Sequence, residues 1–523
     1  MKDIVLNLDD SLEINLYVQI YNQFKERILS GEISPGTKIP SLRRFAKDNA
    51  ISVTTVETAY NQLLVEGYIE SRPKSGYYVS DHIAEVVSDL KTEFKEESLE
   101  SILPMDDSKN VRDKSLIYDE ESFEFSKWKK CMNKVFNEHS NMLQTQGDVQ
   151  GEQALRYEIA KYLYARRGVK CSSNQIVIGA GSQQLAVQLI RILRELNVAH
   201  AATEMPGYGP VREIFRDEGL NVSRIPIDEE GIMVEKLPTN MKSLVYVNPS
   251  NQFPTGVVMP VARRYELIKW AVDNDSYILE DDYDSELRYF GKPVPALKGL
   301  DQSGRVIYLG SFSSTLFAAI KISYMVLPKE LAEIFEKIKD RYSQTCSKAE
   351  QLCLAIYMEE GYYSRNIKRC RRMNAGKLET TMKMFAQAKA DFIEPIDSKS
   401  GLAIMLRIHA DIPVEEVCQT AHKLGLTMRP VQDLCTEKEQ VVVFYFYRVS
   451  DALLRLLIKM FVNNMSKVLA VYERRKLQSP IISGKLPRRK GGGAPPGSSP
   501  AGETPDPPLP HRRCTVPFRF RKP

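Results

Sequence analysis

A helix start rich in small residues is the first feature of this sequence that could bind a phosphate group. Gly181, Ser182 and Gln183 follow the apolar run QIVIG and open the helical run QQLAVQLIRILREL. Small residues at a helix N-terminus allow backbone N–H groups to close on an anion, and the helix dipole favours negative charge there. Many helices that bind no ligand start in the same way, so the meaning of this pattern depends on the patches that accompany it.

Three further patches carry polar or aromatic side chains in loops that follow strand-like runs. They hold Tyr208 in EMPGYG, Asp281 and Tyr283 in EDDYDSELR (280–288), and Ser311, Ser313 and Ser314 in SFSSTL (311–316). A loop tyrosine is commonly a packing residue, and acidic runs at strand ends are commonly solvated or bind metals. The eight cysteines are scattered without a CxxC pair, so we expect no metal site.

The elements that must position polar residues near the N-terminus form a compact block over residues 11–80. Helical periodicity runs through Leu16–Leu29, and Ser, Pro and Gly in SGEISPG end that helix. Two further helical stretches, SLRRFAKDN and SVTTVETAYNQLLVEG, are separated by a tight step. Two short strand-like runs then surround a tip of Lys74, Ser75 and Gly76. The block predicts a helix, a helix-turn-helix and a β-hairpin wing.

The second block, residues 119–475, alternates strand-like runs with amphipathic helical runs. This alternation predicts an α/β domain with a mostly parallel sheet. Residues 81–118 are rich in Glu, Lys, Asp and Ser and have the composition of a solvated linker. The segment 476–523 is rich in Gly, Pro and Ser, so we expect a disordered tail. Its abrupt change in composition indicates a fusion or read-through, with a natural tail as the alternative.

Composition gives no direct sign of a nucleic-acid partner. The formal charge of +5 arises in residues 479–523, which carry nine Lys/Arg against two acids, whereas residues 1–80 carry nine Lys/Arg against ten Asp/Glu. Any DNA contact must therefore use a local patch. The start lacks a signal-peptide pattern, no run approaches a membrane span, and the scattered cysteines suit reduced thiols. We expect a cytoplasmic protein without membrane contact.

The N-terminal block resembles the GntR family of winged helix-turn-helix regulators. The resemblance covers GTKIPSLRRFAKDNAISVTTVETAYNQLLVEGYIESRPKSGYYV from Gly36 onward and implies binding of double-stranded promoter DNA. The family pattern assigns DNA contacts to Ser41, Arg43 and Arg44, to Ser52, Thr54 and Thr55 at the start of the recognition helix, and to Lys74, Ser75 and Gly76 in the wing. Val53 stands where the family usually has an arginine, so the operator sequence cannot be transferred from relatives.

The second block resembles the fold-type I aminotransferases that are fused to GntR heads in the MocR subfamily. The resemblance rests on GDVQGEQALRYEIAKYLYARRGV (147–169), AGSQQL, EMPGYG, NPSNQFPTG (248–256), EDDYDSELR and SFSSTL, in that order. It implies a pyridoxal phosphate cradle. In this resemblance Gly181, Ser182 and Gln183 hold the phosphate and Tyr208 lies against the ring. Asp281 accepts the pyridinium N–H, and Tyr283 bonds the phenolic oxygen.

The residue in the position of the imine-forming lysine is Ser314. A hydroxyl cannot form a stable imine with an aldehyde or act as the amine base, so we expect no catalytic residue and only non-covalent binding of pyridoxal phosphate. Ser311 and Ser313 complete that patch. Lys321 stands where the family has a phosphate-binding arginine, and Gln146 stands where a partner-subunit tyrosine is usual.

Substrate recognition departs from the family pattern as well. An arginine usually holds the substrate carboxylate in the small C-terminal subdomain (about 375–475). Arg448 is the candidate in VVVFYFYRVSD, but it is out of register, and Ala403 replaces a frequent histidine.

The resemblance predicts a homodimeric regulator with a winged-helix head and a fold-type I aminotransferase-like domain that senses a small effector. The expected ligand is pyridoxal or pyridoxamine phosphate held without a covalent link, or an amino-acid-like molecule, unless the domain only dimerises. Two alternatives stay open: an active aminotransferase with a DNA-binding appendage, and an engineered or decayed sensor that has lost its lysine.

Overall fold

The computed structural model describes residues 6–8, 14–81, 122–289, 294–388, 390–396, 400–436 and 439–478. The chain divides into two compact units, Met1–Asn110 and Val111–Pro523. Of the expected linker (81–118) only Asp81 is described, and of the expected tail (476–523) only the three residues that end the last helix are described. The expected disorder of the tail therefore lies outside the described residues.

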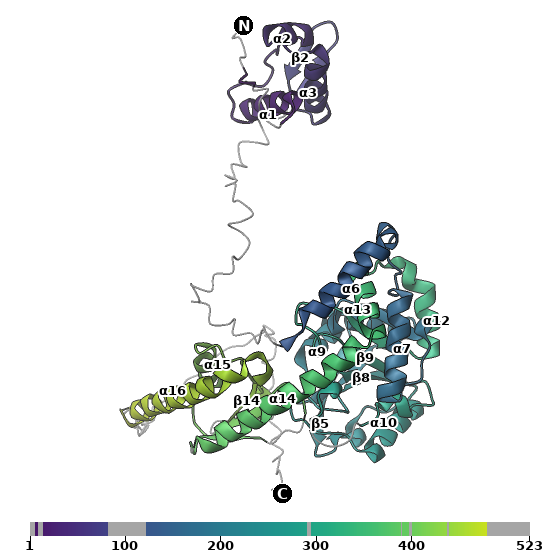
Figure 1. The fold of residues 1–523 in the computed structure, drawn as a ribbon, viewed down its shortest axis with the longest axis vertical. Helices are drawn as coiled ribbons and strands as arrows, with labels where there is room; N and C mark the ends of the chain where they lie inside the picture. Colours follow the sequence, from purple (N-terminus) through teal and green to yellow (C-terminus); the bar gives the residue numbers. More distant parts are fainter. Residues whose placement is uncertain are drawn as a thin grey trace, which may run out of the picture. The chain divides into compact units, whose positions relative to one another are not determined.

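The first unit is a three-helix fold with a β-hairpin (Figure 1). Its elements are α1 (Leu16–Leu29), α2 (Leu42–Asp48), α3 (Val53–Val65), β1 (Ile69–Arg72) and β2 (Gly76–Val79). The core is aromatic: the ring of Phe24 lies 5.6 Å from Phe45 and 5.6 Å, edge to face, from Tyr60. Because these three buried rings come from α1, α2 and α3, they lock the helices together. The predicted winged-helix head is confirmed.

The second unit is built on a large, mostly parallel sheet. Its strand order is β3-β10-β9-β8-β7-β4-β5-β6. Strands β9, β8, β7, β4 and β5 are parallel neighbours, whereas β10 and β6 are antiparallel to the strands that they pair with. The strands are β3 (Ile176–Gly179), β4 (His200–Met205), β5 (Asn221–Asp228), β6 (Gly231–Ile232), β7 (Ser243–Val247), β8 (Tyr277–Asp282), β9 (Val306–Ser311) and β10 (Ser323–Val326). The predicted mostly parallel α/β domain is confirmed.

Helices cover both faces of this sheet. One face packs against α8 (Ser182–Arg194), α9 (Gly209–Asp217) and α12 (Lys329–Ile338). The other packs against α6 (Phe125–Glu138), α7 (Gln153–Arg167), α10 (Val261–Asp273), α11 (Leu297–Leu300) and α13 (Lys348–Glu359). Short 3-10 turns lie between them at η2 (Ser140–Gln144), η3 (Ser173–Gln175), η4 (Val234–Lys236), η5 (Ser285–Leu287) and η6 (Lys339–Arg341). Burial of the strands on both faces explains their nearly continuous apolar runs.

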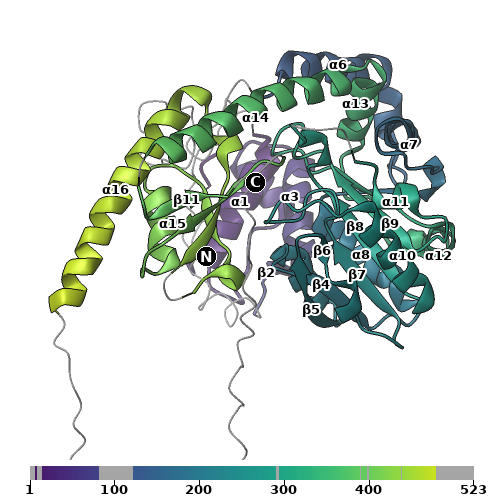
Figure 2. The same cartoon turned by 90° about the horizontal axis from the view of Figure 1, so that it is seen from below.

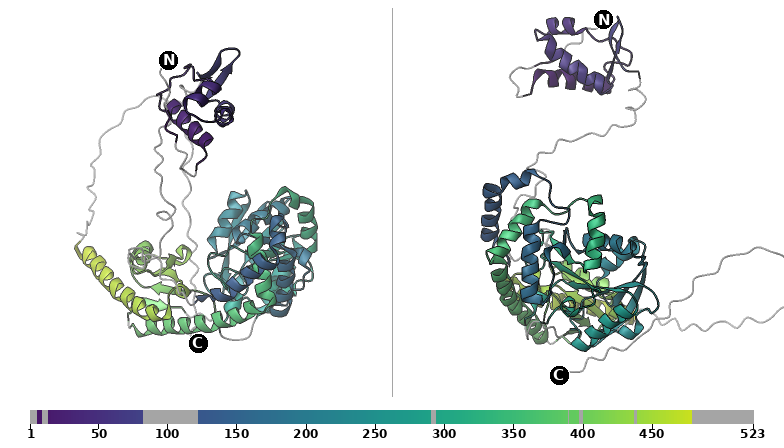
Figure 3. Two further views of the ribbon diagram at one scale, coloured as in Figure 1. Left: turned by 45° about the horizontal axis from the view of Figure 1, so that its top comes forward. Right: turned by 90° about the vertical axis from the view of Figure 1, so that its right-hand side faces the viewer.

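A smaller antiparallel sheet follows, in the order β11-β12-β14-β13. Its elements are β11 (Ile393–Pro395), β12 (Ile404–Ile408), α15 (Val414–His422), β13 (Met428–Pro430), η7 (Gln432–Leu434), β14 (Gln440–Phe444), η8 (Phe446–Arg448) and α16 (Asp451–Gln478). The long helix α14 (Tyr362–Gln387) runs from the side of α6 and α13 to this small sheet (Figure 2). Its far end, through Leu378 and Phe385, belongs to the small core. In Figure 3 the same green helix spans both parts of the unit.

The end of β8 sends neighbouring carboxylates to opposite faces of the large sheet. Tyr277 and Leu279 belong to the core under α8 and α9, whereas Ile278 belongs to the core under α10. Because successive side chains of a strand alternate, Asp281 faces the first side and Asp282 faces the second. Both carboxylates are buried. Two buried carboxyl groups on adjacent residues therefore need separate hydrogen-bonding partners, one set on each face of the sheet.

Arg167, the last residue of α7, compensates Asp282. Its side chain is buried, and its Nε lies 2.8 Å from the Asp282 Oδ2. The remaining guanidinium N–H groups donate to the Ser250 Oγ at 2.8 Å and to the Val294 carbonyl. Burial penalises the charged form of Arg167, but the surrounding acidic groups, Asp282 first among them, together outweigh this effect and raise the pKa of the guanidinium. One arginine thus joins α7, the end of β8 and two loops.

Replacing Arg167 with methionine tests this junction. Arg167→Met leaves the Asp282 carboxylate buried without a counter-ion, so we expect the free energy of unfolding of the second unit to fall by about 3–5 kcal/mol. Denaturant unfolding of the full chain, followed by tryptophan fluorescence, measures the loss. The control Lys170→Met removes an exposed cation close by in the chain and should change stability by less than about 0.5 kcal/mol. Equal stability of the two variants would contradict the assigned role.

Candidate functional site

Asp281 forms the floor of the candidate cradle. Its Oδ2 accepts a hydrogen bond from the Tyr246 hydroxyl at 2.6 Å, and its backbone carbonyl accepts one from the Asn248 amide at 3.0 Å. Its other carboxylate oxygen makes no hydrogen bond within the described residues, so it is available to a ligand. Burial raises the pKa of Asp281 to about 7, although the Tyr246 hydrogen bond acts in the opposite direction.

A second carboxyl, Glu204 at the end of β4, lies behind Asp281. It is buried, and its Oε2 accepts from the Gln252 amide at 3.1 Å, while its Oε1 has no partner among the described residues. Burial raises the pKa of Glu204 to about 8, and the negative charge of Asp281 adds to the effect. Glu204 is therefore largely protonated at neutral pH and adds little negative charge beneath the cradle.

Gln252 connects the two loops that carry the aromatic side chains of the site. Its amide nitrogen donates to the carbonyls of Pro206 and Phe253, and its oxygen accepts from the Thr255 hydroxyl. The ring of Phe253 meets Tyr208 edge to face at 5.8 Å between centroids. Phe253 also packs against apolar residues of the small sheet. The predicted ring-stacking residue Tyr208 thus lies on a loop that is held from behind.

Tyr283 and the serine patch lie beside each other. The Ser314 hydroxyl donates to the Tyr283 carbonyl at 2.6 Å. Burial raises the pKa of the Tyr283 phenol, whose hydroxyl forms a hydrogen bond with Ser313. The Ser311 and Ser313 hydroxyls are 2.9 Å apart, and the Ser323 hydroxyl donates to Ser311 at 2.9 Å. At the position where the family has its lysine, the structure holds a hydroxyl that is already engaged.

The predicted phosphate end lies at the N-terminus of α8. Gly181 is the N-cap with a φ of +99°, and a side chain at this position would meet no atom within 4 Å. The N–H groups of Ser182 and Gln183 lie in the first helical turn and have no acceptor within the helix. The preceding backbone is held because the Ala180 N–H donates to the Thr345 hydroxyl at 3.0 Å. This geometry fits an anion at the start of α8.

Three further residues that the family resemblance singled out are exposed to solvent. The Lys321 side chain is exposed and makes no hydrogen bond or ion pair within the described residues, although its backbone carbonyl accepts from the Cys346 thiol. Gln146 is exposed, and only its carbonyl is engaged, by Lys348 at 3.2 Å. Arg448 is exposed in η8, with its guanidinium 5.8 Å from the Tyr445 ring and 5.5 Å from the Tyr447 ring.

On the first unit, the recognition helix α3 begins with a network of small polar side chains. Ser52 caps α3 by accepting from the Thr55 N–H at 3.0 Å, and the two hydroxyls are 2.7 Å apart. Thr54 is exposed, and its carbonyl accepts from Thr58. Val53 is 43% exposed, so an apolar side chain stands in a largely polar helix start. Such a surface can approach DNA closely, with a methyl contact at Val53.

The helix before it and the wing supply the positive charge. Ser41 caps α2, Arg44 pairs with Asp48 at 3.5 Å, and the exposed Arg43 makes no hydrogen bond or ion pair within the described residues. In the wing, the exposed Lys74 has a φ of 61°, next to Gly76 with a φ of 108°. These two left-handed residues form the tight tip that is expected to enter a groove.

Several contributors escape prediction from the sequence. In the wing, the Ser75 and Tyr78 hydroxyls are 2.7 Å apart, and Lys38 and Arg72 lie 5.6 and 4.4 Å from the Tyr78 ring. Lys38 comes from the segment before α2, and only its contact with the wing reveals it as part of this surface. In the cradle, the sequence does not reveal the roles of Tyr246, Glu204 and Gln252, because their hydrogen-bonding partners lie more than 30 residues away in the chain.

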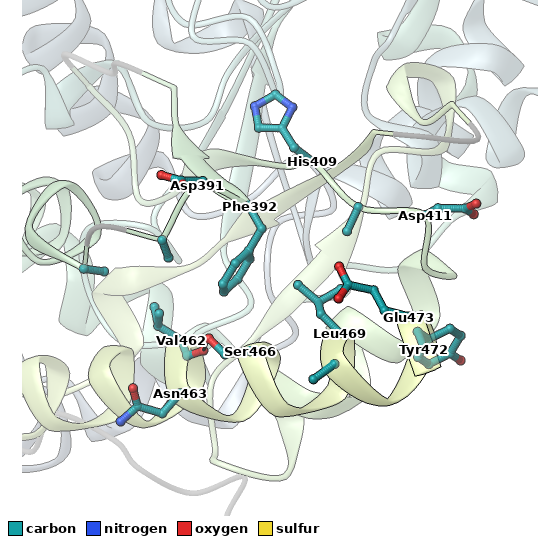
Figure 4. Close-up of a pocket in the computed structure, with 14 residues that line it drawn as sticks. Asp391, Phe392, His409, Asp411, Val462, Asn463, Ser466, Leu469, Tyr472 and Glu473 are labelled. Carbon is teal, nitrogen blue, oxygen red and sulfur yellow. Dashed lines mark hydrogen bonds between the residues drawn. The ribbon is translucent and has the colours of Figure 1, made fainter. Parts of the chain in front are cut away.

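A separate groove of about 790 Å³ lies in the small subdomain between α16 and the edge of the small sheet (Figure 4). The Phe392 ring points toward α16, whereas the His409 imidazole points away from it and lies 3.3 Å from the Glu394 carboxylate. None of the predicted cofactor residues lines this groove.

Within the described residues, no cluster of three metal-ligand side chains occurs and no helix is long and apolar enough to cross a membrane.

Two family profiles match the chain. The profile of the GntR family of bacterial regulatory proteins matches residues 16–79, and that of aminotransferase class I and II matches residues 116–470. The regulatory protein MocR of Rhizobium meliloti, a probable regulator of rhizopine catabolism, is 30% identical over 438 residues, which cover 82% of this chain and 88% of that protein. The chain is a MocR-type member of the GntR family. The predicted resemblance is confirmed.

Other relatives agree with this assignment to the MocR type. The HTH-type transcriptional regulator YdeL of Bacillus subtilis (strain 168) is 39% identical over 432 residues, covering 82% of this MocR-type chain and 92% of YdeL. The crystal structure of kynurenine aminotransferase from Pyrococcus horikoshii matches with a TM-score of 0.59 and 22% identity, covering 74% of this chain and 99% of the enzyme. The enzyme likeness shows the shared fold, and the regulator likeness shows the family.

Glu204 makes the stability of this MocR-type chain depend on pH. Its pKa is raised from 4.5 to about 8 in the folded state, so the stability linked to its proton is complete below about pH 4 and is lost as pH rises toward 8. Between pH 5 and 8, the unfolding free energy of the wild type should fall as pH rises. In Glu204→Gln this slope should be shallower by up to about 1.4 kcal/mol per pH unit. Denaturant unfolding at several pH values measures the slope.

The matched control is Glu229→Gln, which removes an exposed carboxyl from the same unit. Its slope should equal that of the wild type. A Glu204→Gln slope that is indistinguishable from the wild-type slope would show that Glu204 is ionised in the folded protein.

Proposed function

We propose that this MocR-type transcription regulator binds promoter DNA through residues 11–80 and senses a small ligand through a non-catalytic cradle in its aminotransferase-like unit. The observation that carries the proposal is the Ser314 hydroxyl, which donates to the Tyr283 carbonyl at 2.6 Å in the position of the imine-forming lysine. A hydroxyl in this place supports reversible binding without a covalent bond to the protein.

Pyridoxal phosphate is the ligand class that the cradle fits best. The Asp281 carboxylate would accept the pyridinium N–H, Tyr208 would lie against the ring, and Tyr283 would face the phenolic oxygen. The start of α8, from Gly181 to Gln183, would receive the phosphate. When bound, pyridoxal phosphate supplies an electron-withdrawing ring and an aldehyde. An amino-acid-like effector, bound alone or together with pyridoxal phosphate, would be the signal that the regulator senses.

The alternative function, an active aminotransferase with a DNA-binding appendage, needs an amine that reaches the cofactor aldehyde. Ser314 does not provide it, and the exposed side chain of Lys321 favours an anion contact over imine formation. Without an amine base, the α-proton of an amino acid has no acceptor at this position. These observations favour the sensor over the enzyme.

We also infer that the functional form is a homodimer, as in the predicted family arrangement. Exposed aromatic side chains on α6 and α7 support a self-association surface: Phe136 is 54%, Tyr157 62% and Tyr164 64% exposed. Tyr157 and Tyr164 are seven residues apart and therefore share one face of α7. Exposed apolar side chains that share a helix face are typical of protein–protein contacts. A DNA-binding regulator is expected to act in the cytoplasm.

Promoter binding tests the DNA surface. Arg43→Ala and Lys74→Ala each remove an exposed cation, so each should weaken binding to a duplex that the wild-type protein selects from a random pool. Each should also reduce the slope of log K against log salt by about 0.9 for every lost phosphate contact. Fluorescence anisotropy at several salt concentrations measures both quantities.

The control for charge is Lys129→Ala, which removes an exposed cation from α6 in the second unit. It should keep wild-type affinity and salt slope. If Arg43→Ala and Lys74→Ala behaved like this control, the proposed docking surface would be wrong.

Restoring the lysine tests the cradle. Wild-type protein incubated with pyridoxal phosphate and borohydride should gain no adduct at residue 314, because serine forms no stable imine. Ser314→Lys should gain one covalently attached pyridoxyl group. Peptide mass spectrometry should locate this group at position 314. The double variant Ser314→Lys with Asp281→Ala tests whether Asp281 helps to bind the cofactor. Loss of the Asp281 carboxylate should lower the yield of the pyridoxyl adduct. A wild-type adduct at Lys321 would overturn the non-covalent proposal.

A further inference from the structure

A small cavity lies between α7, η5 and the first half of α14. Its volume is about 80 Å³, and its lining comes from the end of α7, from η5 and from one face of α14. None of the predicted cofactor residues lines it. The cavity is large enough to hold more than a single water molecule, so a small polyatomic ligand fits its size.

Cationic side chains from two helices converge on this cavity. Arg166 comes from α7, and Lys368 and Arg371 come from α14. Arg166 and Lys368 make no hydrogen bond or ion pair within the described residues. Arg371 uses its Nε to donate to the Glu286 carbonyl, which leaves its two terminal nitrogen atoms available. Arg167 also lines the cavity, but each of its three guanidinium nitrogen atoms already donates, to Asp282, Ser250 and Val294.

Hydroxyl groups complete a donor set suited to an anion. Ser285 and Ser364 line the cavity, and the Ser285 Oγ is buried without a hydrogen-bond partner in the described part of the chain. A buried hydroxyl without a partner carries a desolvation cost that a ligand can relieve. These donors face a single acidic side chain in the lining.

That acid is Glu286, and its charge is weakened. Its Oε1 accepts from the Tyr162 hydroxyl at 3.2 Å. Burial, followed by the negative charge of Asp282, raises the pKa of Glu286 to about 7. The available positive charge of the lining, from Arg166, Lys368 and Arg371, therefore exceeds its negative charge at neutral pH.

We propose that this cavity binds a small tetrahedral anion, namely inorganic phosphate or the phosphate group of a small monoester. Two arginines offer paired N–H donors, Lys368 offers a compact charge, and Ser285 offers a hydroxyl, which together match phosphate oxygens. A carboxylate would leave some of these donors unused. The enclosed position between two helices and η5 favours a free ion over the backbone of a duplex.

The bound anion joins parts of the unit that matter to the cradle. η5 begins two residues after Tyr283, and α14 continues into the small subdomain that packs against Phe253. A phosphate held by Arg166, Lys368 and Arg371 thus clamps α7 to α14 beside the end of β8. This site is independent of pyridoxal phosphate, and its test does not rely on the proposed sensor function.

Phosphate binding by the full-length chain tests the proposal. Isothermal titration with inorganic phosphate at constant ionic strength is compared for the wild type, the cavity variant Arg166→Met with Lys368→Met, and a control variant. The control, Lys170→Met with Arg372→Met, removes the same charge from exposed positions of the same region that do not line the cavity. Circular dichroism and thermal unfolding without phosphate verify that all three proteins are folded.

We expect phosphate affinity to fall at least tenfold in the cavity variant and to stay within twofold of the wild type in the control. Ser285→Ala, which keeps every charge, should weaken phosphate binding by a smaller factor. Equal affinities in all proteins, or equal losses in the cavity variant and the control, would overturn the site. A duplex that displaces phosphate from the cavity, with a loss of DNA binding confined to the cavity variant, would overturn the assignment to a small free anion.

Discussion

The buried ion pair between Arg167 and Asp282 is the interaction on which the second unit depends. Taking two charges out of water is costly, and the pair is tolerated because each of the three guanidinium nitrogen atoms of Arg167 donates to an acceptor. In return, the end of β8 is held in one position. Asp281, which is adjacent in sequence, therefore reaches the opposite face of the sheet, where its carboxylate is buried.

The helices and strands whose apolar residues recur with a regular spacing were predictable from the sequence. The helix expected over Leu16–Leu29 has these bounds in the structure. The run QIVIG supplies β3, which begins at its isoleucine, and the run YILE lies in β8. The spacing of apolar residues predicts which face of a helix or strand is buried. This prediction needs only residues that are close together in the chain. The wing was predictable for a similar reason, since a Lys-Ser-Gly tip between two short strand-like runs has few other conformations.

The contacts that tune the site were not predictable, because they join residues far apart in the chain. Arg167 and Asp282 are separated by 115 residues, and Glu204 and Gln252 by 48. Nothing in EMPGYG indicates that its glutamate is buried with an unpartnered oxygen. The roles of Asp281, Tyr283 and the serine patch came from family resemblance and stay predictions, although the structure brings Tyr283, Ser313 and Ser314 together.

Under the proposed function, the hydroxyl of Ser314 would determine how long a ligand stays in the cradle. A molecule fixed by a covalent bond leaves only after a chemical step, whereas one held by hydrogen bonds and stacking leaves at the rate at which these contacts break. Occupancy of such a site follows the surrounding concentration with little delay. A cradle that holds pyridoxal phosphate without the lysine would therefore report the ligand concentration at that moment and keep no record of earlier exposure.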